Sequence, residues 1–550
     1  MAAESYVFRR NRLRGTFDGG TAKLRIAVVG SAAMLLSFGS GVLLENLAHL
    51  NMDVVFLCVV MSLSLGRTQQ GAGRGHRLVS FLAFPLVALA AAEIGTVMIH
   101  HPNGGEAMFG AAIALSIWLR RFGAAAARLG TLVALPFIAI LITPVPQPPG
   151  AQAPLWSAVA GMIAFGWVWI AHEVAQRTGF LPAAPATRQA PAASAKTATS
   201  GKTTAQRAAA RRGWARPDPS SRLAAQMGVS LAAAFALGRW LFPAHWTWTV
   251  LTAFIVNSGN RGRGDVVYKS LLRVAGAGVG TVAATLLAGR FGTHDSTSIV
   301  LILIVLSVAN WLRGFSYGYW AGCVTAVLSL LYGYFGETGT RMLRMRIEEI
   351  LLGAAIGVVV AWFVAPVKTS DVVRARIAAA LAALSELLAE VRSGHATTDG
   401  HRRVFEGCVE RVNQVAGPVL THRAVVRNRA LLVRGRHPGE AIEAVRRCLE
   451  PVAALVNCDD LAEPSARKLI ALVSANVGEV RRAIGRVPGS GWRPFPAAQA
   501  TPSPAYRDAL EQINDAVHDI HEVYVGPLGE PDSKRESEPT RSEPATPTPA

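Results

Sequence analysis

The segment LRIAVVGSAAMLLSFGSGVLL, residues 24–44, decides the fold class of this chain. It is almost entirely apolar, and it is as long as the roughly 20 residues that an α-helix needs to cross the ~30 Å hydrocarbon core of a bilayer. A basic stretch precedes it, but no A-x-A cleavage signal follows it and more apolar runs do. We therefore interpret it as an uncleaved first membrane span, not as a signal peptide.

Similar apolar runs follow in two groups of six, separated by a polar gap. The runs after the first are 52–65, 78–99, 108–119, 124–142 and 155–171, then 223–241, 246–256, 271–288, 299–312, 317–335 and 347–365. Helices are expected throughout, because backbone polar groups find no water to bond in lipid. The sequence thus predicts an all-α, polytopic membrane protein with two six-helix repeats, about twelve spans in all, and a cytoplasmic helical domain.

The domain boundaries follow from changes in composition. They are a basic N-terminus (1–23), a first transmembrane repeat (24–172), a disordered basic Ala/Pro-rich linker (173–221), a second transmembrane repeat (222–366), a cytoplasmic helical bundle (367–528) and a disordered polar tail (529–550). The bundle is indicated by apolar residues at helical spacing, namely Ile377, Leu381, Leu384, Leu388 and Val391. Later helices are predicted over 439–457, 464–484 and 504–524.

Composition and charge exclude several classes of protein. With 51% hydrophobic residues and a mean hydropathy of +0.31, the chain is too apolar for a soluble protein. Its net charge of +19 could suit nucleic acid, but Lys and Arg cluster beside the apolar runs, whereas loops 45–51, 100–107 and 143–154 have none. That alternation predicts cytoplasmic N- and C-termini in the cytoplasmic membrane. We expect the lipid bilayer, and no nucleic acid, as partner.

Motifs for enzymatic chemistry are weak. The five cysteines show no CxxC or Cys/His spacing, so no metal site is expected. Gly201-Lys202-Thr203 lacks the upstream glycine of a phosphate-binding loop, since position 196 is Lys. No nucleophile and base set appears either. We therefore expect no cofactor, no catalytic residue and no enzyme.

A short motif recurs at matching places in the two groups. Trp118-Leu119-Arg120-Arg121-Phe122 ends the short fourth run, and Trp311-Leu312-Arg313-Gly314-Phe315 ends the short tenth run. Six spans per copy give both halves the same orientation, and substrate paths lie between such repeats. Arginine suits carboxylate recognition. The predicted substrate path therefore comprises Trp118, Arg120, Phe122, Trp311, Arg313, Phe315 and Arg273. The alternative is that these arginines only reach to lipid phosphates and set topology.

Other charges and glycines also occur within the runs. Glu93 lies inside the third run, and Arg346, Glu348 and Glu349 begin the last. A charge near the bilayer centre costs at least ~2.5–3.5 kcal/mol, so it usually faces a cavity or a partner. These four residues are candidates for proton coupling or an ion pair. Glycines four residues apart are predicted to pack helices closely: Gly276, Gly280, Gly353 and Gly357.

The second half resembles the fusaric-acid-resistance (FUSC) family over roughly residues 220–370, and the first half resembles it more faintly. The resemblance is carried by His245-Trp246-Thr247-Trp248-Thr249-Val250-Leu251-Thr252-Ala253, Arg273, Gly276–Thr281, Arg346-Ile347-Glu348-Glu349, Gly353, Gly357 and Ala365-Pro366. It implies an inner-membrane protein related to aromatic-acid exporters and, more distantly, to plant aluminium-activated malate channels, often assembled as oligomers.

The residues and the resemblance together lead to one expected function and two alternatives. We expect proton-linked secondary efflux of small organic, in particular aromatic, carboxylic acids, by a protein able to form a homo-oligomer. The alternatives are a passive anion channel and a membrane-anchored scaffold that recruits partners through its cytoplasmic bundle.

Overall fold

The structure, a computed structural model, describes most of the chain in two separate units. The described residues are 2–50, 53–69, 74–142, 153–181, 219–243, 245–287, 295–334, 340–394, 398–427, 437–458, 461, 463–487, 491–497 and 505–525. Unit 1 is Met1–Val367 and unit 2 is Lys368–Ala550.

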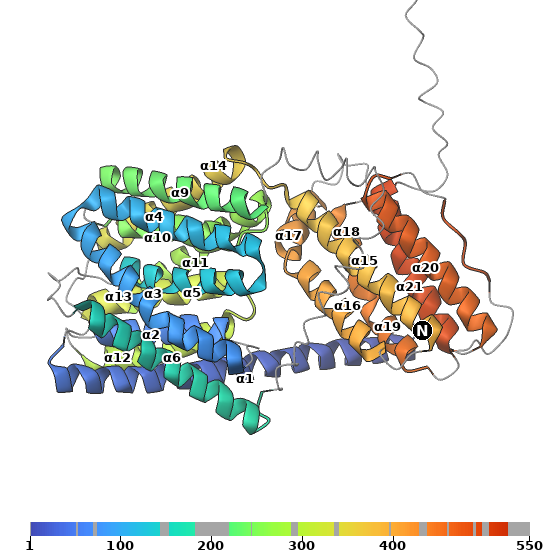
Figure 1. The fold of residues 1–550 in the computed structure, drawn as a ribbon, viewed down its shortest axis with the longest axis horizontal. Coiled ribbons are helices and arrows are strands. Elements are labelled where there is room, and N and C mark those ends of the chain that lie inside the picture. Colours follow the sequence, from blue (N-terminus) through green and yellow to red (C-terminus); the bar gives the residue numbers. More distant parts are fainter. Residues whose placement is uncertain are drawn as a thin grey trace, which may run out of the picture. The chain divides into compact units, whose positions relative to one another are not determined.

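Unit 1 is built from two sets of helices (Figure 1). The first set is α1 (Ala2–Ala48), α2 (Asp53–Thr68), α3 (Arg74–His100), α4 (Pro102–Trp118), the 3-10 turn η1 (Leu119–Phe122), α5 (Ala124–Ile142) and α6 (Ala153–Arg177). The second set is α9 (Pro219–Leu241), α10 (Thr247–Asn257), α11 (Arg263–Leu287), α12 (Ser296–Leu312), α13 (Tyr317–Tyr334) and α14 (Thr340–Phe363). No strand occurs in the described ranges, so the predicted all-α class is confirmed for them.

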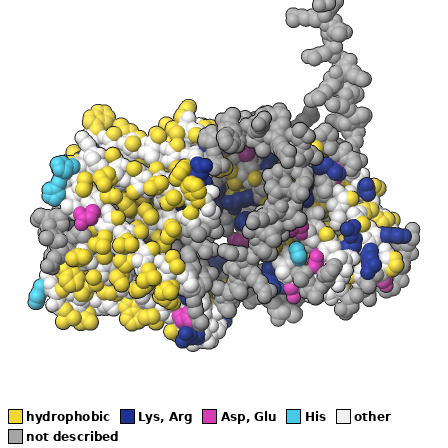
Figure 2. All heavy atoms as spheres, in the orientation of Figure 1, with side chains coloured by type: hydrophobic (Ala, Val, Ile, Leu, Met, Phe, Trp, Pro, Cys, Tyr) yellow, Lys and Arg dark blue, Asp and Glu magenta, His cyan; other side chains and the backbone are white. Residues whose placement is uncertain are grey.

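Several of these helices are suited to cross a membrane. Four are long and apolar enough by length and composition: Gly20–Ala48, Arg77–His100, Leu155–Arg177 and Arg263–Ala283. Shorter apolar helices cover Val54–Thr68, Thr247–Asn257, Ser296–Leu312 and Tyr317–Leu331. Figure 2 shows a face of unit 1 dominated by hydrophobic side chains, with few charged ones. The chain is a multi-pass membrane protein, while the number of twelve spans and the direction of each stay predictions.

Two helices begin well before the apolar runs that predicted them. α4 begins at Pro102 and α14 at Thr340, six and seven residues before their apolar runs. The apolar pattern missed these polar first turns, and α4 is therefore not short: like α12 it has 17 residues. Proline is well suited to the first turn of a helix, where its missing N–H leaves no bond unmade.

The predicted linker 173–221 is wrong at both of its ends. α6 continues to Arg177, and α9 begins at Pro219. Glu173 explains the first extension, because its carboxylate lies 3.0 Å from the Arg177 guanidinium and 3.6 Å from that of Arg77. The predicted disorder of 182–218 and of the tail 529–550, and the motif Gly201-Lys202-Thr203, lie outside the described residues.

The same helix pairings recur in the two sets. In the first set, α2 and α3 pack on α6, α1 packs on α2 and α6, and α5 packs on α3 and α4. In the second set, α10 and α11 pack on α14, α9 packs on α10 and α14, and α13 packs on α11 and α12. The contacts between the two sets match as well. The fourth helix of the first set, α4, packs on the first helix of the second set, α9, and the fourth helix of the second set, α12, packs on α1. This pattern is what a duplicated unit related by a two-fold axis would give.

Glycines allow the closest of these helix contacts. A Cβ at Gly276 or Gly280 of α11 would lie 2.5 or 2.3 Å from a backbone oxygen of α13. A Cβ at Gly353 of α14 would lie 2.5 Å from the Thr249 oxygen of α10, and one at Gly357 would meet Asn257 at 2.9 Å. At Gly276, Gly280 and Gly353 the helix backbones therefore touch directly, whereas Gly357 makes room for the side chains of Asn257 and Val256.

Unit 2 is a second group of helices with its own core. It contains α15 (Thr369–Ser393), α16 (Thr398–Asn413), α17 (Ala416–Arg427), α18 (Pro438–Arg447), α19 (Leu449–Val456), α20 (Pro464–Ile484) and α21 (Ala505–Val525). The apolar stripe of α15, from Ile377 to Val391, lies in that core. The prediction of a single helix over 439–457 is wrong, because α18 ends at Arg447 and a new helix, α19, begins after Cys448. Pro451 lies in the first turn of α19, and in a continuous helix its ring would clash with the carbonyl of Arg447.

The cap of α18 predicts a pH-dependent stability in unit 2. His437 is the N-cap residue, and its Nδ1 accepts the Gly439 N–H at 3.1 Å, which requires an unprotonated Nδ1. Burial, His422 and Arg423 lower the pKa of His437, against a smaller opposite effect of Glu440. The stabilisation that the His437 cap gives to the folded unit is therefore complete above pH 6.5, the ordinary pKa of histidine. It is lost as the pH falls below 6.5 and through the lower pKa of His437 in the folded protein.

The measurement is hydrogen exchange of the α18 amides in the whole protein at about pH 8 and about pH 5. We expect the opening free energy to fall by ~1 kcal/mol on acidification, as for loss of an N-cap. His437→Asn caps without titrating and should remove this difference. An unchanged pH dependence in that variant would assign the effect to another group.

Candidate functional site

A cavity lies between the two sets of helices in unit 1. It is bounded by α1 and α2 of the first set and by α10, α11, α12 and α13 of the second. Its volume is about 270 Å³. This is close to the ~300 Å³ lower end of small-molecule sites, so it suits a small ligand.

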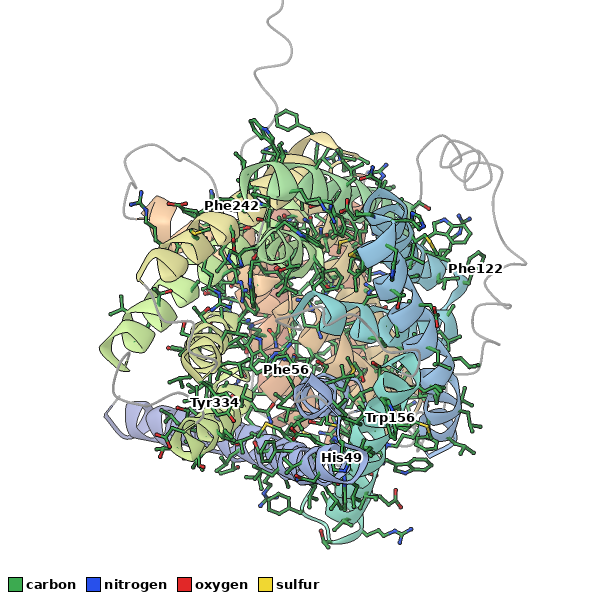
Figure 3. The ribbon with its side chains drawn as sticks, turned by 90° about the vertical axis from the view of Figure 1, so that its left-hand side faces the viewer. His49, Phe56, Phe122, Trp156, Phe242 and Tyr334 are labelled. Atoms are coloured by element: carbon green, nitrogen blue, oxygen red, sulfur yellow. The ribbon has the colours of Figure 1, made fainter. Side chains whose placement is uncertain are left out.

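The walls of the cavity are apolar and rich in aromatic rings. The aromatic lining residues are Phe38, Phe56, Trp248, Tyr317, Trp320 and Tyr334. Figure 3 views the helices of unit 1 nearly end on, with Phe56 near the middle of the bundle and Tyr334 on α13. Among the described residues that line the cavity, none is acidic. Such walls suit a flat apolar body and disfavour a cation.

One stripe of α13 follows the cavity along its whole length. The stripe consists of Tyr317, Trp320, Val324, Val327, Leu328, Leu331 and Tyr334. Tyr317 and Tyr334 are the first and last residues of the helix. At a rise of 1.5 Å per residue they are ~26 Å apart along the axis, which approaches the ~30 Å hydrocarbon thickness.

Two arginines supply the charge of the cavity. Arg273 of α11 is only 2% exposed, and its Nε has no hydrogen-bond partner in the part of the chain that the structure describes. Arg313, at the C-cap of α12, lies over the Trp320 ring at 4.2 Å from its centroid. Arg67 is near enough for its charge to act on Arg313. Like charges without a carboxylate between them make this region attractive to anions.

The structure places the other predicted path residues outside this cavity. Trp118 and Phe122 form an edge-to-face pair with centroids 5.1 Å apart, and Trp311 and Phe315 form another at 5.8 Å. Phe122 is 62% and Phe315 50% exposed. Exposed aromatic pairs at helix ends are typical of membrane-interface anchors. Neither these four rings nor Arg120 lines the cavity. Of the seven predicted residues, it brings together Arg273 and Arg313.

At the equivalent place in the helix pairings, phenylalanine rings pack against one another. By the spacing of the repeated motif, Tyr317 and Trp320 correspond to Ala124 and Ala127 of α5. There the helices α4, α5 and α9 meet through phenylalanine rings: Phe109 lies 5.3 Å from Phe137 and 5.7 Å from Phe235, between centroids. The two sets of helices therefore differ in what they enclose, although their pairings match.

The predicted charge cluster of α14 divides into an exposed and a buried part. Arg344 and Glu348 form an exposed ion pair at 3.0 Å. Arg346 and Glu349 are buried, and the Arg346 guanidinium lies 4.2 Å from the Trp248 ring centroid. Glu93, in contrast, is exposed on α3 and does not reach the cavity.

Sequence reasoning missed several residues of the site. Trp248 entered only through the family resemblance, and Tyr317, Trp320, Tyr334 and Arg67 were not selected. A usable signal existed, since Tyr317, Trp320, Val324, Leu331 and Tyr334 repeat every three to four residues or a multiple of it. That spacing marks one helix face but does not say whether the face meets protein, lipid or a cavity. No group of three or more His, Cys, Asp or Glu residues suited to a metal occurs in the described ranges.

The fold and the cavity define an all-helical, multi-pass membrane protein with an arginine-bearing apolar site between its two sets of helices. Residues 231–389 match the family model described as fusaric acid resistance protein-like. This match confirms the resemblance to that family for the second set of helices and the start of unit 2. Neither the curated proteins nor the solved structures contain a match to the chain.

Proposed function

We propose that the protein is a secondary transporter that exports small aromatic carboxylic acids across the cytoplasmic membrane, linked to protons. The observation that supports this most directly is the pair Arg273 and Arg313 in a cavity with otherwise apolar walls. The family match supports a membrane transporter and not an enzyme. Assembly as a homo-oligomer remains part of the proposal.

In the proposed bound state, the carboxylate of the substrate lies at the arginines and its ring packs between tryptophans. Guanidinium groups can donate two parallel hydrogen bonds to one carboxylate. Trp248 and Trp320 would each add an aromatic contact of ~0.5–1.5 kcal/mol beyond burial. A second charge on the ligand would have to enter an apolar wall, which is costly. We therefore expect monocarboxylates to be preferred over dicarboxylates.

The predicted topology supports export as the direction of transport. The Lys/Arg distribution puts the Arg313 end of α12 on the cytoplasmic side. An anion from the cytoplasm would therefore meet Arg67 and Arg313 first. The lining stripe of α13 continues to Tyr334 at the other end of the helix. A substrate could therefore pass along α13 once the side chains and helices that face this stripe move apart.

A passive anion channel is the second candidate, and the same continuous stripe favours it. The two functions are separated by uptake of a labelled aromatic monocarboxylate into inverted vesicles and by recording in planar bilayers. The transporter predicts uptake that depends on a proton gradient and competition by other aromatic monocarboxylates but weakly by dicarboxylates. Steady anion currents without a proton gradient would instead establish the channel. Absence of both uptake and current would overturn the transport function.

A further inference from the structure

A buried polar pair lies directly behind one wall of the cavity. Glu349 of α14 has no exposed surface, and neither of its carboxylate oxygens accepts a hydrogen bond from the residues that the structure describes. Arg346 is buried one turn before it. A carboxylate in such surroundings gains much less from solvation than one in water, so its proton affinity depends on the charges beside it.

Trp248 connects this pair to the cavity. Its indole ring contacts the Arg346 guanidinium at 4.2 Å and is also part of the cavity wall. Arg346 itself does not line the cavity. The helices that carry the two residues are in close contact, because Gly353 packs against the backbone of Thr249 and Ala253. A shift of the Arg346 side chain would therefore act on Trp248 directly.

The elements packed against this pair carry other ionisable groups. α14 packs on α9, α10 and α11. On α14 itself, Glu348 turns outward to Arg344. α10 contains no ionisable residue. α11 brings Arg273 in its middle and Arg263, Asp265, Tyr268 and Lys269 in its first two turns, and α9 brings Arg222 and Arg239 near its ends. On α14, Arg346 is the buried charged residue nearest to Glu349 in the sequence.

Building on the proposed function, we propose that Glu349 takes up and releases the transported proton, and that Trp248 couples this event to substrate binding through its contact with Arg346. The carboxylate of Glu349 gains a proton from one side of the membrane and returns to its ionised form by releasing that proton to the other side. When Glu349 is ionised, its charge compensates Arg346. When Glu349 is protonated, Arg346 keeps its charge, and the carboxylate no longer competes with the face of the Trp248 indole for the guanidinium.

This exchange of partners changes the cavity. A strong contact with Arg346 holds the Trp248 ring against α14, whereas an ionised Glu349 draws the guanidinium away and allows the ring to turn toward the ligand. Substrate binding and proton binding thereby influence each other, as linkage requires. Glu93 cannot play this part, because it lies on the same outward stripe of α3 as Leu82 and Leu86 and away from the cavity.

The decisive experiment compares two transport assays on the same vesicles. One measures accumulation of a labelled aromatic monocarboxylate driven by a proton gradient, and the other measures exchange of labelled for unlabelled substrate without a gradient. If one proton is exchanged for each anion, a gradient of one pH unit supports about tenfold accumulation of the substrate. A tenfold ratio of protons and a tenfold ratio of substrate correspond to the same free energy, about 1.4 kcal/mol. Glu349→Gln should abolish the accumulation and keep the exchange, whereas Glu348→Gln and Glu93→Gln should keep both.

Two tryptophan variants test the coupling element. Trp248→Leu should weaken substrate binding in both assays, because Trp248 also contacts the ligand, and should in addition lower the ratio of protons to substrate. Trp248→Phe should recover part of that ratio because it retains a ring for Arg346. Trp320→Leu is the matched control, since Trp320 also lines the cavity and also lies 4.2 Å from an arginine. It should weaken substrate binding in both assays but leave the ratio of protons to substrate unchanged.

The outcomes separate this inference from the proposed function. If Glu349→Gln retains gradient-driven accumulation while Arg313→Gln loses transport, the proposed function stands and the coupling role is wrong. If Arg313→Gln retains both assays, the substrate site itself is wrong. Loss of both assays in Glu349→Gln and also in Glu349→Asp, which keeps the acid, would mark Glu349 as a structural residue and would equally overturn the coupling role.

Discussion

Replacement of Arg313 by Gln should raise the substrate concentration for half-maximal transport by ~10–100-fold. Hydrogen bonds to charged groups are worth ~1.5–3 kcal/mol, and each 1.4 kcal/mol is a factor of ten. Gln keeps an amide donor but is shorter by two bonds and removes the charge. The effect is expected to be large because no other described carboxylate competes for this side chain and the surrounding wall is apolar. The measurement is initial uptake against substrate concentration in inverted vesicles.

Arg120 provides an unusually close control for this prediction. It has the same place in the repeated motif, after the same Trp-Leu pair, but it does not line the cavity. Arg120→Gln should leave the half-maximal concentration within about twofold, as is usual for a charge outside the binding site. Equal losses in the two variants would show that both arginines act through lipid or topology, and would remove Arg313 from the site.

Replacement of Gly280 by Ala should lower the free energy of unfolding of unit 1 by about 3 kcal/mol, the upper part of the range for overpacked cores. The new methyl group would lie 2.3 Å from the Gly322 oxygen and 2.9 Å from Thr325 Cβ. The oxygen belongs to the backbone of α13 and cannot turn aside as a side chain could. The helices α11 and α13 must therefore move apart, which also disturbs the cavity wall that α13 forms.

Gly278 is the matched control, because it lies on the same helix two residues away and a Cβ there meets nothing within 4 Å. Gly278→Ala should be neutral or stabilising, since Ala favours a helix by about 1 kcal/mol over Gly. Thermal unfolding of the two variants in detergent compares them directly. If Gly280→Ala unfolds at the same temperature as Gly278→Ala, the close approach of α11 and α13 does not limit stability.

Much of the fold could be predicted from hydropathy alone. Each helix of unit 1 contains an apolar run that the sequence displays, because a helix in lipid must be apolar over most of its length. The starts of α4 and α14 could not be predicted this way, since their first turns are polar and lie beyond the apolar run. Pro451 could have indicated that a helix ends near Cys448. The apolar spacing on both sides of Cys448 instead suggested one continuous helix.

The site was only partly predictable. Arg273 could be found because a charge beside an apolar span is conspicuous, and Arg313 because it belongs to the repeated motif. Arg120 was included as the other copy of that motif, although the structure places it outside the cavity. A motif cannot tell these arginines apart, because the difference lies in other helices: Tyr317 and Trp320 line the space near Arg313, whereas Ala124 and Ala127 occupy the matching positions near Arg120.

The phenylalanines at α4, α5 and α9 bear on the history of the chain. An ancestor with two identical halves would have carried two equivalent chambers, and Phe109, Phe137 and Phe235 occupy the place where the second would be. The family model matches residues 231–389, which contain four of the six helices that line the open cavity, namely α10, α11, α12 and α13. Reopening the closed chamber with smaller side chains would show whether the duplicated architecture still supports two routes.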